Sequence, residues 1–218
     1  MHPDAMPSPP IHPRIETAVT AFTVGFLVLL AALHVLAPEY DPAHRMISEY
    51  AVGTYGVLMQ LAFVSLGVAM LALRTLLRQY MTRASLGLAV MGMALFGAAI
   101  FKTDVLTQPP SHSIAHVFHQ LCGTVVILGF PVLATLLARR LVRHAHWASA
   151  RGLLYSFTAL LWVGQLAFFT AVKVSGRPPI GAVGWPNRLM MVAYCAWIVA
   201  VATHGGKRPA SEQPSATS

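Results

Sequence analysis

Six long apolar stretches, separated by short polar connections, limit what this chain can fold into. They lie at about 16–36, 54–77, 84–101, 113–138, 152–172 and 186–204. A helix of about 20 apolar residues crosses a bilayer core, and a helix pairs its own backbone groups where no water can do so. A membrane β-barrel would show alternating strands of about ten residues, and the sequence shows no such alternation. The pattern predicts an all-α, polytopic membrane helix bundle with six transmembrane helices.

The composition agrees with a lipid environment. Of the 218 residues, 56% are hydrophobic and 10% are charged, whereas soluble domains carry roughly 25% charged residues. The net charge of +8 is spread over short connections, which argues against nucleic acid as a partner and leaves membrane lipids as the expected surroundings. Cys122 and Cys195 fall inside apolar stretches and are interpreted as small buried side chains.

Two polar segments flank the expected transmembrane domain at 16–204. Residues 1–15 hold five prolines, and residues 205–218 read GGKRPASEQPSATS. Both compositions predict disorder. The first apolar stretch is longer than the 7–15 residues of a signal-peptide core, and no small-residue cleavage site follows it. We therefore expect it to be a retained helix.

The distribution of Lys and Arg predicts the orientation of the bundle. Counting alternate connections gives ten on one side: Arg14, Arg74, Arg78, Arg83, Arg139, Arg140, Arg143, Arg151, Lys207 and Arg208. The other side has five: Arg45, Lys102, Lys173, Arg177 and Arg188. Because basic residues concentrate on the cytoplasmic side, we expect both termini in the cytoplasm and the chain in the inner (cytoplasmic) membrane.

Polar residues gather at the predicted outer ends of the helices. Ser48 and Glu49 precede the second stretch, Asp104 and His116 flank the entry to the fourth, and Arg188 lies at the start of the sixth. Ionisable side chains at membrane depth usually face the bundle interior. We expect these five residues to form an outward-facing pocket that binds or moves a small molecule or lipid, unless the protein serves as a membrane accessory subunit. Asp104 and Arg188 are expected to pair, with Glu49 as the rival partner of Arg188.

Three histidines form a stripe at the start of the fourth stretch. His112, His116 and His119 fall within about 60° of one another on a helix. With Asp104 they could bind a metal ion such as zinc. The same residues could instead transfer protons, or form a buried network that fixes helix packing. The sequence leaves these alternatives open, and with them the question of whether the protein is an enzyme.

The same outer residues carry a resemblance to a family. The chain resembles the prokaryotic membrane proteins grouped as domain-of-unknown-function family 998. Its elements are Ser48-Glu49-Tyr50 after the first helix, Lys102-Thr103-Asp104 at the end of the third, His116 in the fourth, and Gly184 with Arg188 in the sixth. Lys102 replaces the usual Pro, and Asn187 stands where an acidic or amide residue is common. The resemblance covers about 18–204 and implies roughly six helices.

A membrane enzyme acting on a lipid-like substrate is the alternative function. Metal-dependent hydrolases of the ceramidase and adiponectin-receptor type also place Ser, Asp and His near helix ends. They require Ser-x-x-x-His and a late His-x-x-x-His pair. Here Val52 follows Ser48 at that spacing, and His204 is the one histidine of the last stretch. The hydrolase pattern is therefore incomplete.

Overall fold

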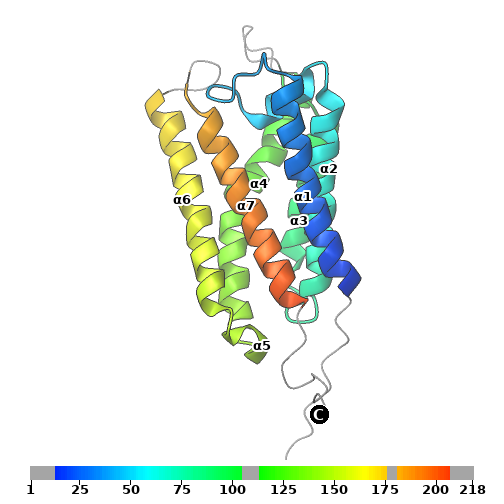
Figure 1. Cartoon of the computed structure of the whole chain (residues 1–218), viewed down its shortest axis with the longest axis vertical. Coiled ribbons are helices and arrows are strands. Elements are labelled where there is room, and N and C mark those ends of the chain that lie inside the picture. Colours follow the sequence, from blue (N-terminus) through cyan, green and yellow to red (C-terminus); the bar gives the residue numbers. More distant parts are fainter. Residues whose placement is uncertain (1–12, 105–112, 176–180, 207–218) are drawn as a thin grey trace, which may run out of the picture.

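Helices make up one bundle in the computed structural model, which describes residues 13–104, 113–175 and 181–206. The elements are α1 (Pro13–Leu36), the 3-10 helix η1 (Ile47–Val52), α2 (Gly56–Leu77), α3 (Leu86–Ile100), α4 (Ile114–Leu141), α5 (Ala145–Ala148), α6 (Arg151–Ser175) and α7 (Gly184–Gly205). Figure 1 shows the long helices packed side by side. No strand occurs in these described ranges, which confirms the all-α class.

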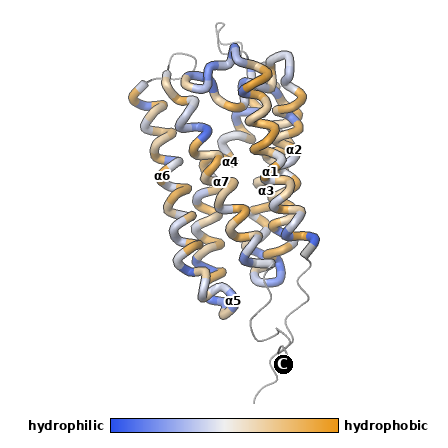
Figure 2. The backbone as a smooth tube through the Cα atoms, viewed as in Figure 1, coloured by the Kyte–Doolittle hydropathy of each residue, from blue (hydrophilic) through white to orange (hydrophobic). Residues whose placement is uncertain are grey.

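The long helices coincide with the six apolar stretches to within a few residues. Five of them (α1, α2, α4, α6 and α7) are long and apolar enough to cross a membrane. Hydrophobic residues dominate their length, and hydrophilic residues gather toward the two ends of the bundle (Figure 2). The protein is thus a multi-pass membrane protein. The exception in length is α3 with 15 residues, or roughly 22 Å against a hydrocarbon core of about 30 Å.

The helix ends modify the predicted boundaries of the flanking segments. α1 begins at Pro13, within the segment 1–15 that was expected to be disordered, and α7 continues to Gly205. Proline suits the first helical position because its missing N–H would be unpaired there anyway. The remaining parts of both segments, 1–12 and 207–218, lie outside the described residues, and so do the predictions made for them.

The helices alternate in direction, which gives the bundle two distinct ends. The start of α1, the end of α7 and the short α5 lie at one end (Figure 1), called here the terminal end. The opposite end carries the connection between α1 and α2, residues 37–55, called the cap segment. It lies across the tops of the helices in Figure 1, and this end is called the cap end.

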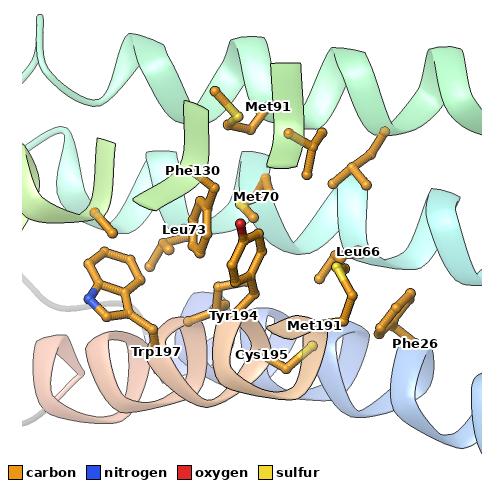
Figure 3. Packing of buried hydrophobic residues seen from close by; sticks show 14 of the residues in the cluster. Phe26, Leu66, Met70, Leu73, Met91, Phe130, Met191, Tyr194, Cys195 and Trp197 are labelled. Carbon is orange, nitrogen blue, oxygen red and sulfur yellow. The ribbon is translucent and has the colours of Figure 1, made fainter. Parts of the chain in front are cut away.

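The core forms around α7, which is the most enclosed helix. In its most apolar window 67% of residues are buried, against 28% for α1 and α6. Tyr194 and Trp197 are fully buried and pack on Phe130 of α4, with ring centroids 4.8 Å and 5.6 Å away (Figure 3). Large apolar side chains such as Val28 and Leu166 remain exposed on the outside. That arrangement fits a bundle surrounded by lipid.

A proline inside α4 accounts for a polar contact between α4, α6 and α7. Pro131 has no N–H, so the carbonyl of Ile127, one turn earlier, lacks its helical partner. The Tyr194 hydroxyl of α7 donates to that carbonyl at 2.8 Å. Gln165 of α6 lies 2.6 Å from the same hydroxyl and leaves its own amide nitrogen without a partner. One hydroxyl has a single hydrogen, so we assign the Gln165 amide the opposite way round, donating to Tyr194.

This contact predicts a coupled effect of two substitutions. Tyr194→Phe leaves the Ile127 carbonyl unpaired and should lower the free energy of unfolding in detergent by about 1–3 kcal/mol. Pro131→Ala supplies a backbone N–H for that carbonyl, so in its background Tyr194→Phe should cost clearly less. Tyr155→Phe, on the outer face of α6, is the matched control and should cost little. Equal losses from Tyr194→Phe in both backgrounds would contradict the assignment.

Candidate functional site

Arg188, in the first turns of α7, is the centre of the cap end. Its side chain is 4% exposed. Nε donates to His34 Nε2 at 2.6 Å. Nη1 donates to the carbonyls of Arg45 at 2.6 Å, Gly184 at 3.1 Å and Pro42 at 3.2 Å. A guanidinium has five N–H donors in a fixed fork, and this one binds acceptors from α1, the cap segment and α7.

Two aromatic side chains complete the surroundings of Arg188. Nη2 donates to the Tyr50 hydroxyl at 3.1 Å, and the guanidinium lies 5.6 Å from the Tyr50 ring centroid, which adds a cation–π attraction. The His34 Nδ1 lies 2.6 Å from the Leu30 carbonyl. Because only a protonated nitrogen can donate to a carbonyl, the proton of His34 sits on Nδ1. His34 is therefore a neutral acceptor for Arg188.

Further contacts hold the cap segment on α7. The backbone N–H of Gly184 donates to the Ala43 carbonyl at 2.9 Å, and the backbone N–H of Ile47 donates to Asn187 Oδ1 at 3.1 Å. A Cβ at Gly184 would overlap the Pro42 carbonyl oxygen. Gly184 and Arg188, the two residues of the resemblance in this helix, therefore both hold the cap segment on α7. The glycine lets the cap segment approach closely, and the arginine binds its carbonyls.

Glu49 belongs to the cap segment's own hydrogen-bonding pattern. It is 2% exposed. Its carboxylate accepts from Arg45 Nη1 and from the backbone N–H of Met46, both at 2.8 Å. The carboxylate thus closes the start of η1, as acids often do at helix N-termini. Ser48, half-buried in the same 3-10 helix, shows no hydrogen bond of its hydroxyl within the described ranges.

Asp104 and His116 form a second network, where α3 ends and α4 begins. Asp104 accepts from Ser113 Oγ at 2.6 Å and from the backbone N–H of Ser113 at 3.1 Å. Ser113 Oγ accepts from the backbone N–H of His116 at 3.0 Å and so caps α4. His116 Nδ1 accepts from the backbone N–H of Asp104 at 3.0 Å and lies 3.1 Å from the hydroxyl of the buried Thr103.

The expected ion pair between Asp104 and Arg188 is wrong, and so is its rival with Glu49. Cap-segment carbonyls, His34 and Tyr50 take up the Arg188 donors, while Arg45 neutralises Glu49 and Ser113 donates to Asp104. The structure thus brings Ser48, Glu49 and Arg188 together at the cap segment. It places Asp104 and His116 with each other at the turn between α3 and α4.

The histidine stripe divides between two roles. His119 is 5% exposed, and its Nδ1 lies 2.7 Å from the Phe101 carbonyl and 3.2 Å from that of Ala98. It therefore caps the last carbonyls of α3. His116 instead faces Asp104. The described residues contain no cluster of three or more metal-ligating side chains, and His112 lies outside them. The zinc site of His112, His116, His119 and Asp104 stays a prediction.

Ser113, His116 and Asp104 have the residue types of a hydrolase triad but not its order of contacts. In a triad a histidine ring nitrogen takes the serine proton and the carboxylate orients the other ring nitrogen. Here the serine hydroxyl donates directly to the carboxylate. His116 Nδ1 receives a backbone N–H, so its neutral ring carries the proton on Nε2. The geometry is that of a helix cap.

The sequence patterns did not point to His34 and Gln60, and they gave Tyr50 only as part of the Ser48-Glu49-Tyr50 element. His34 and Tyr50 bind Arg188, and Gln60 Nε2 of α2 donates to the Ala99 carbonyl near the end of α3 at 2.7 Å. The available signal was the placement of His34 and Gln60 inside apolar stretches, because a polar side chain at that depth needs a partner. Nothing in the pattern names that partner.

Comparison with known proteins gives one match. The model of a family described as a protein of unknown function (DUF998) matches residues 20–204, which contain both networks. Neither the curated proteins nor the solved structures include a match.

Arg188→Lys tests how the cap segment is held. Lysine keeps the charge but has one nitrogen in place of the planar fork, so most of the five acceptors lose their donor. Backbone amides of residues 43–50 should exchange hydrogen faster, and the free energy of unfolding should fall by at least about 1–3 kcal/mol, the cost of one unpaired buried group. Arg151→Lys, at the exposed start of α6, is the control. Unchanged exchange in the cap segment would refute the anchoring role.

Proposed function

The chain belongs to the DUF998 family of proteins of unknown function, and from this premise we propose a six-span binding protein of the cytoplasmic membrane. Both termini lie in the cytoplasm, and residues 16–204 form the transmembrane unit. The protein binds or moves a small molecule or lipid at its cap end, alone or as an accessory subunit. The alternative is a membrane enzyme that acts on a lipid-like substrate.

Charge supports the proposed orientation. In the described ranges the terminal end carries Arg14, Arg74, Arg78, Arg83, Arg139, Arg140, Arg143 and Arg151. The cap end carries Arg45, Lys102, Lys173 and Arg188, and Arg188 is buried. The positive-inside rule thus favours the terminal end as cytoplasmic.

The capping of α3 supports the sixth crossing. A helix that stops within hydrocarbon exposes carbonyls that neither its own N–H groups nor water can pair. Gln60 binds the Ala99 carbonyl, and His119 binds those of Ala98 and Phe101. With these acceptors paired, a 15-residue helix can end below the membrane surface, and the chain can continue outward through Thr103 and Asp104.

One observation favours binding over catalysis: the reactive groups at the cap end are committed to internal hydrogen bonds. Glu49 binds Arg45 and a backbone N–H, Asp104 accepts two bonds from Ser113, and His116 Nδ1 receives a backbone N–H. A general base must reach the proton that it abstracts, and these hydrogen bonds hold the two carboxylates and the His116 ring against their own chain. These networks act as a rigid frame, and Ser48 with the exposed rim of the cap segment offers the surface for a ligand.

The proposed binding function predicts that the protein retains its ligand and does not convert it chemically. The full-length protein, purified without chelator and placed in vesicles of extracted membrane lipid, should keep a non-covalently bound species in native mass spectrometry. The lipid composition should stay constant over hours. Time-dependent loss of one lipid with the wild type but not with Asp104→Asn would contradict it in favour of the enzyme. Near-stoichiometric zinc that disappears in His116→Ala would make that enzyme metal-dependent.

A further inference from the structure

An open cavity lies at the terminal end, away from the cap segment and its networks. Its volume is about 590 Å³, and it is lined by Tyr80, Met81, Thr82, Arg83, Arg140, Arg143 and His144. The first four belong to the turn between α2 and α3, and the others to the end of α4 and the residues after it. We propose that this cavity binds a phosphate-bearing anion, and that the phosphate is the headgroup of an anionic lipid or a small soluble phosphate ester.

The arginines around the cavity have no carboxylate partner among the residues that the structure describes. Arg83, Arg140 and Arg143 are exposed, and none of them forms a salt bridge in the described part of the structure. The sequence contains no Asp or Glu between residues 50 and 103, nor between 105 and 211. Glu16, in the first turn of α1, is the described carboxylate at this end. Three arginines converge on one cavity without an acid among its lining residues.

Aromatic packing fixes the wall of the cavity. The Tyr80 ring stacks on His146 at 6.0 Å with an interplanar angle of 3°, and it meets His144 and Trp147 edge-on at 5.5 Å and 5.7 Å. His146 and His204 each place Nε2 near the other's carbonyl, at 3.1 Å and 3.0 Å. The turn between α2 and α3 is thereby held against α5 and the end of α7, so the arginines project from a defined frame.

The lining chemistry matches a phosphate. Guanidinium groups bind phosphate oxygens through two parallel N–H bonds. Burial raises the pKa of Tyr80, so its phenol stays a neutral hydroxyl beside the arginines. A volume of about 590 Å³ lies within the roughly 300–1,000 Å³ of small-molecule sites, which is enough for a headgroup. The cavity also lies beside the ends of α2 and α4, and the ends of membrane-spanning helices are where lipid headgroups are expected.

Anion binding at this cavity goes beyond the proposed function. Only the assignment of the cavity to one leaflet depends on the proposed orientation. A cytoplasmic terminal end places the cavity at the inner leaflet, where basic residues attract anionic lipid. A reversed orientation would move the site to the other leaflet and leave its chemistry intact. Topology and anion binding can therefore fail separately.

The test compares two triple variants of the full-length protein in lipid nanodiscs. The cavity variant is Arg83→Gln, Arg140→Gln and Arg143→Gln. The control removes the same charge from the same end outside the lining, with Arg78→Gln, Arg139→Gln and Arg151→Gln. Native mass spectrometry counts phosphatidylglycerol molecules that stay bound after loosely held lipid is stripped from discs of phosphatidylglycerol and phosphatidylcholine. Wild type and control should retain one, and the cavity variant none. The cavity variant should lose at least about a hundredfold in affinity, because each hydrogen bond between a guanidinium and a phosphate oxygen is worth roughly tenfold or more, and the control arginines make no such bond to this ligand.

A second arm identifies the source of the phosphate. The same proteins in pure phosphatidylcholine discs are titrated with inorganic phosphate and with glycerol 3-phosphate by calorimetry. If wild type and control bind one of these soluble phosphates and the cavity variant does not, the ligand is a soluble anion. If no protein binds them but the wild type retains phosphatidylglycerol, the ligand is the lipid headgroup. Equal losses of binding in both variants would show that the arginines act only as a diffuse surface charge, which would overturn the site. A wild type that binds none of the probes would overturn it as well. Unfolding midpoints of the variants show whether each remains folded.

Discussion

Backbone carbonyls left unpaired at helix ends and breaks are the constraint on which this structure depends. Hydrocarbon offers them no water, and each would cost free energy if left alone. Arg188 binds three carbonyls at the cap end, and Tyr194 binds the one that Pro131 leaves open. Gln60 and His119 bind those at the end of α3. Polar side chains that the sequence suggests as site residues therefore serve as hydrogen-bond donors to backbone carbonyls of the bundle.

This constraint separates the frame of the molecule from its binding surfaces. Glu49, Asp104 and His116 are held in internal hydrogen bonds at the cap end, which connect the segments of that end to one another. At the terminal end, no carboxylate is among the described residues that line the cavity with its three arginines. We therefore infer a second ligand surface at the terminal end, besides the one proposed at the cap end, and the paired charges of the cap end maintain its geometry.

The helices could be predicted because a run of apolar residues marks each of them in the sequence. The contacts between helices could not, because no local pattern marks two residues that meet only in the fold. Apolar runs placed all six long helices to within a few residues. The expected pair of Asp104 with Arg188 followed from charge alone. The real partners of Arg188 include the carbonyls of Pro42 and Arg45, and every residue has a carbonyl, so no pattern marks those two. The donor that Tyr194 supplies to the Ile127 carbonyl, beside Pro131, is likewise a long-range contact that only the fold brings about.

We propose that the chain crosses the membrane six times although α3 has only 15 residues. Reporter fusions at Gln79 and Gln108, on the two sides of α3 in the sequence, test it most directly, with His144 and Gly181 to follow the later crossings. Six crossings with cytoplasmic termini predict inside signals at Gln79 and His144 and outside signals at Gln108 and Gly181. An inside signal at Gln108 would show that α3 does not cross, and the capping of its end would need another explanation.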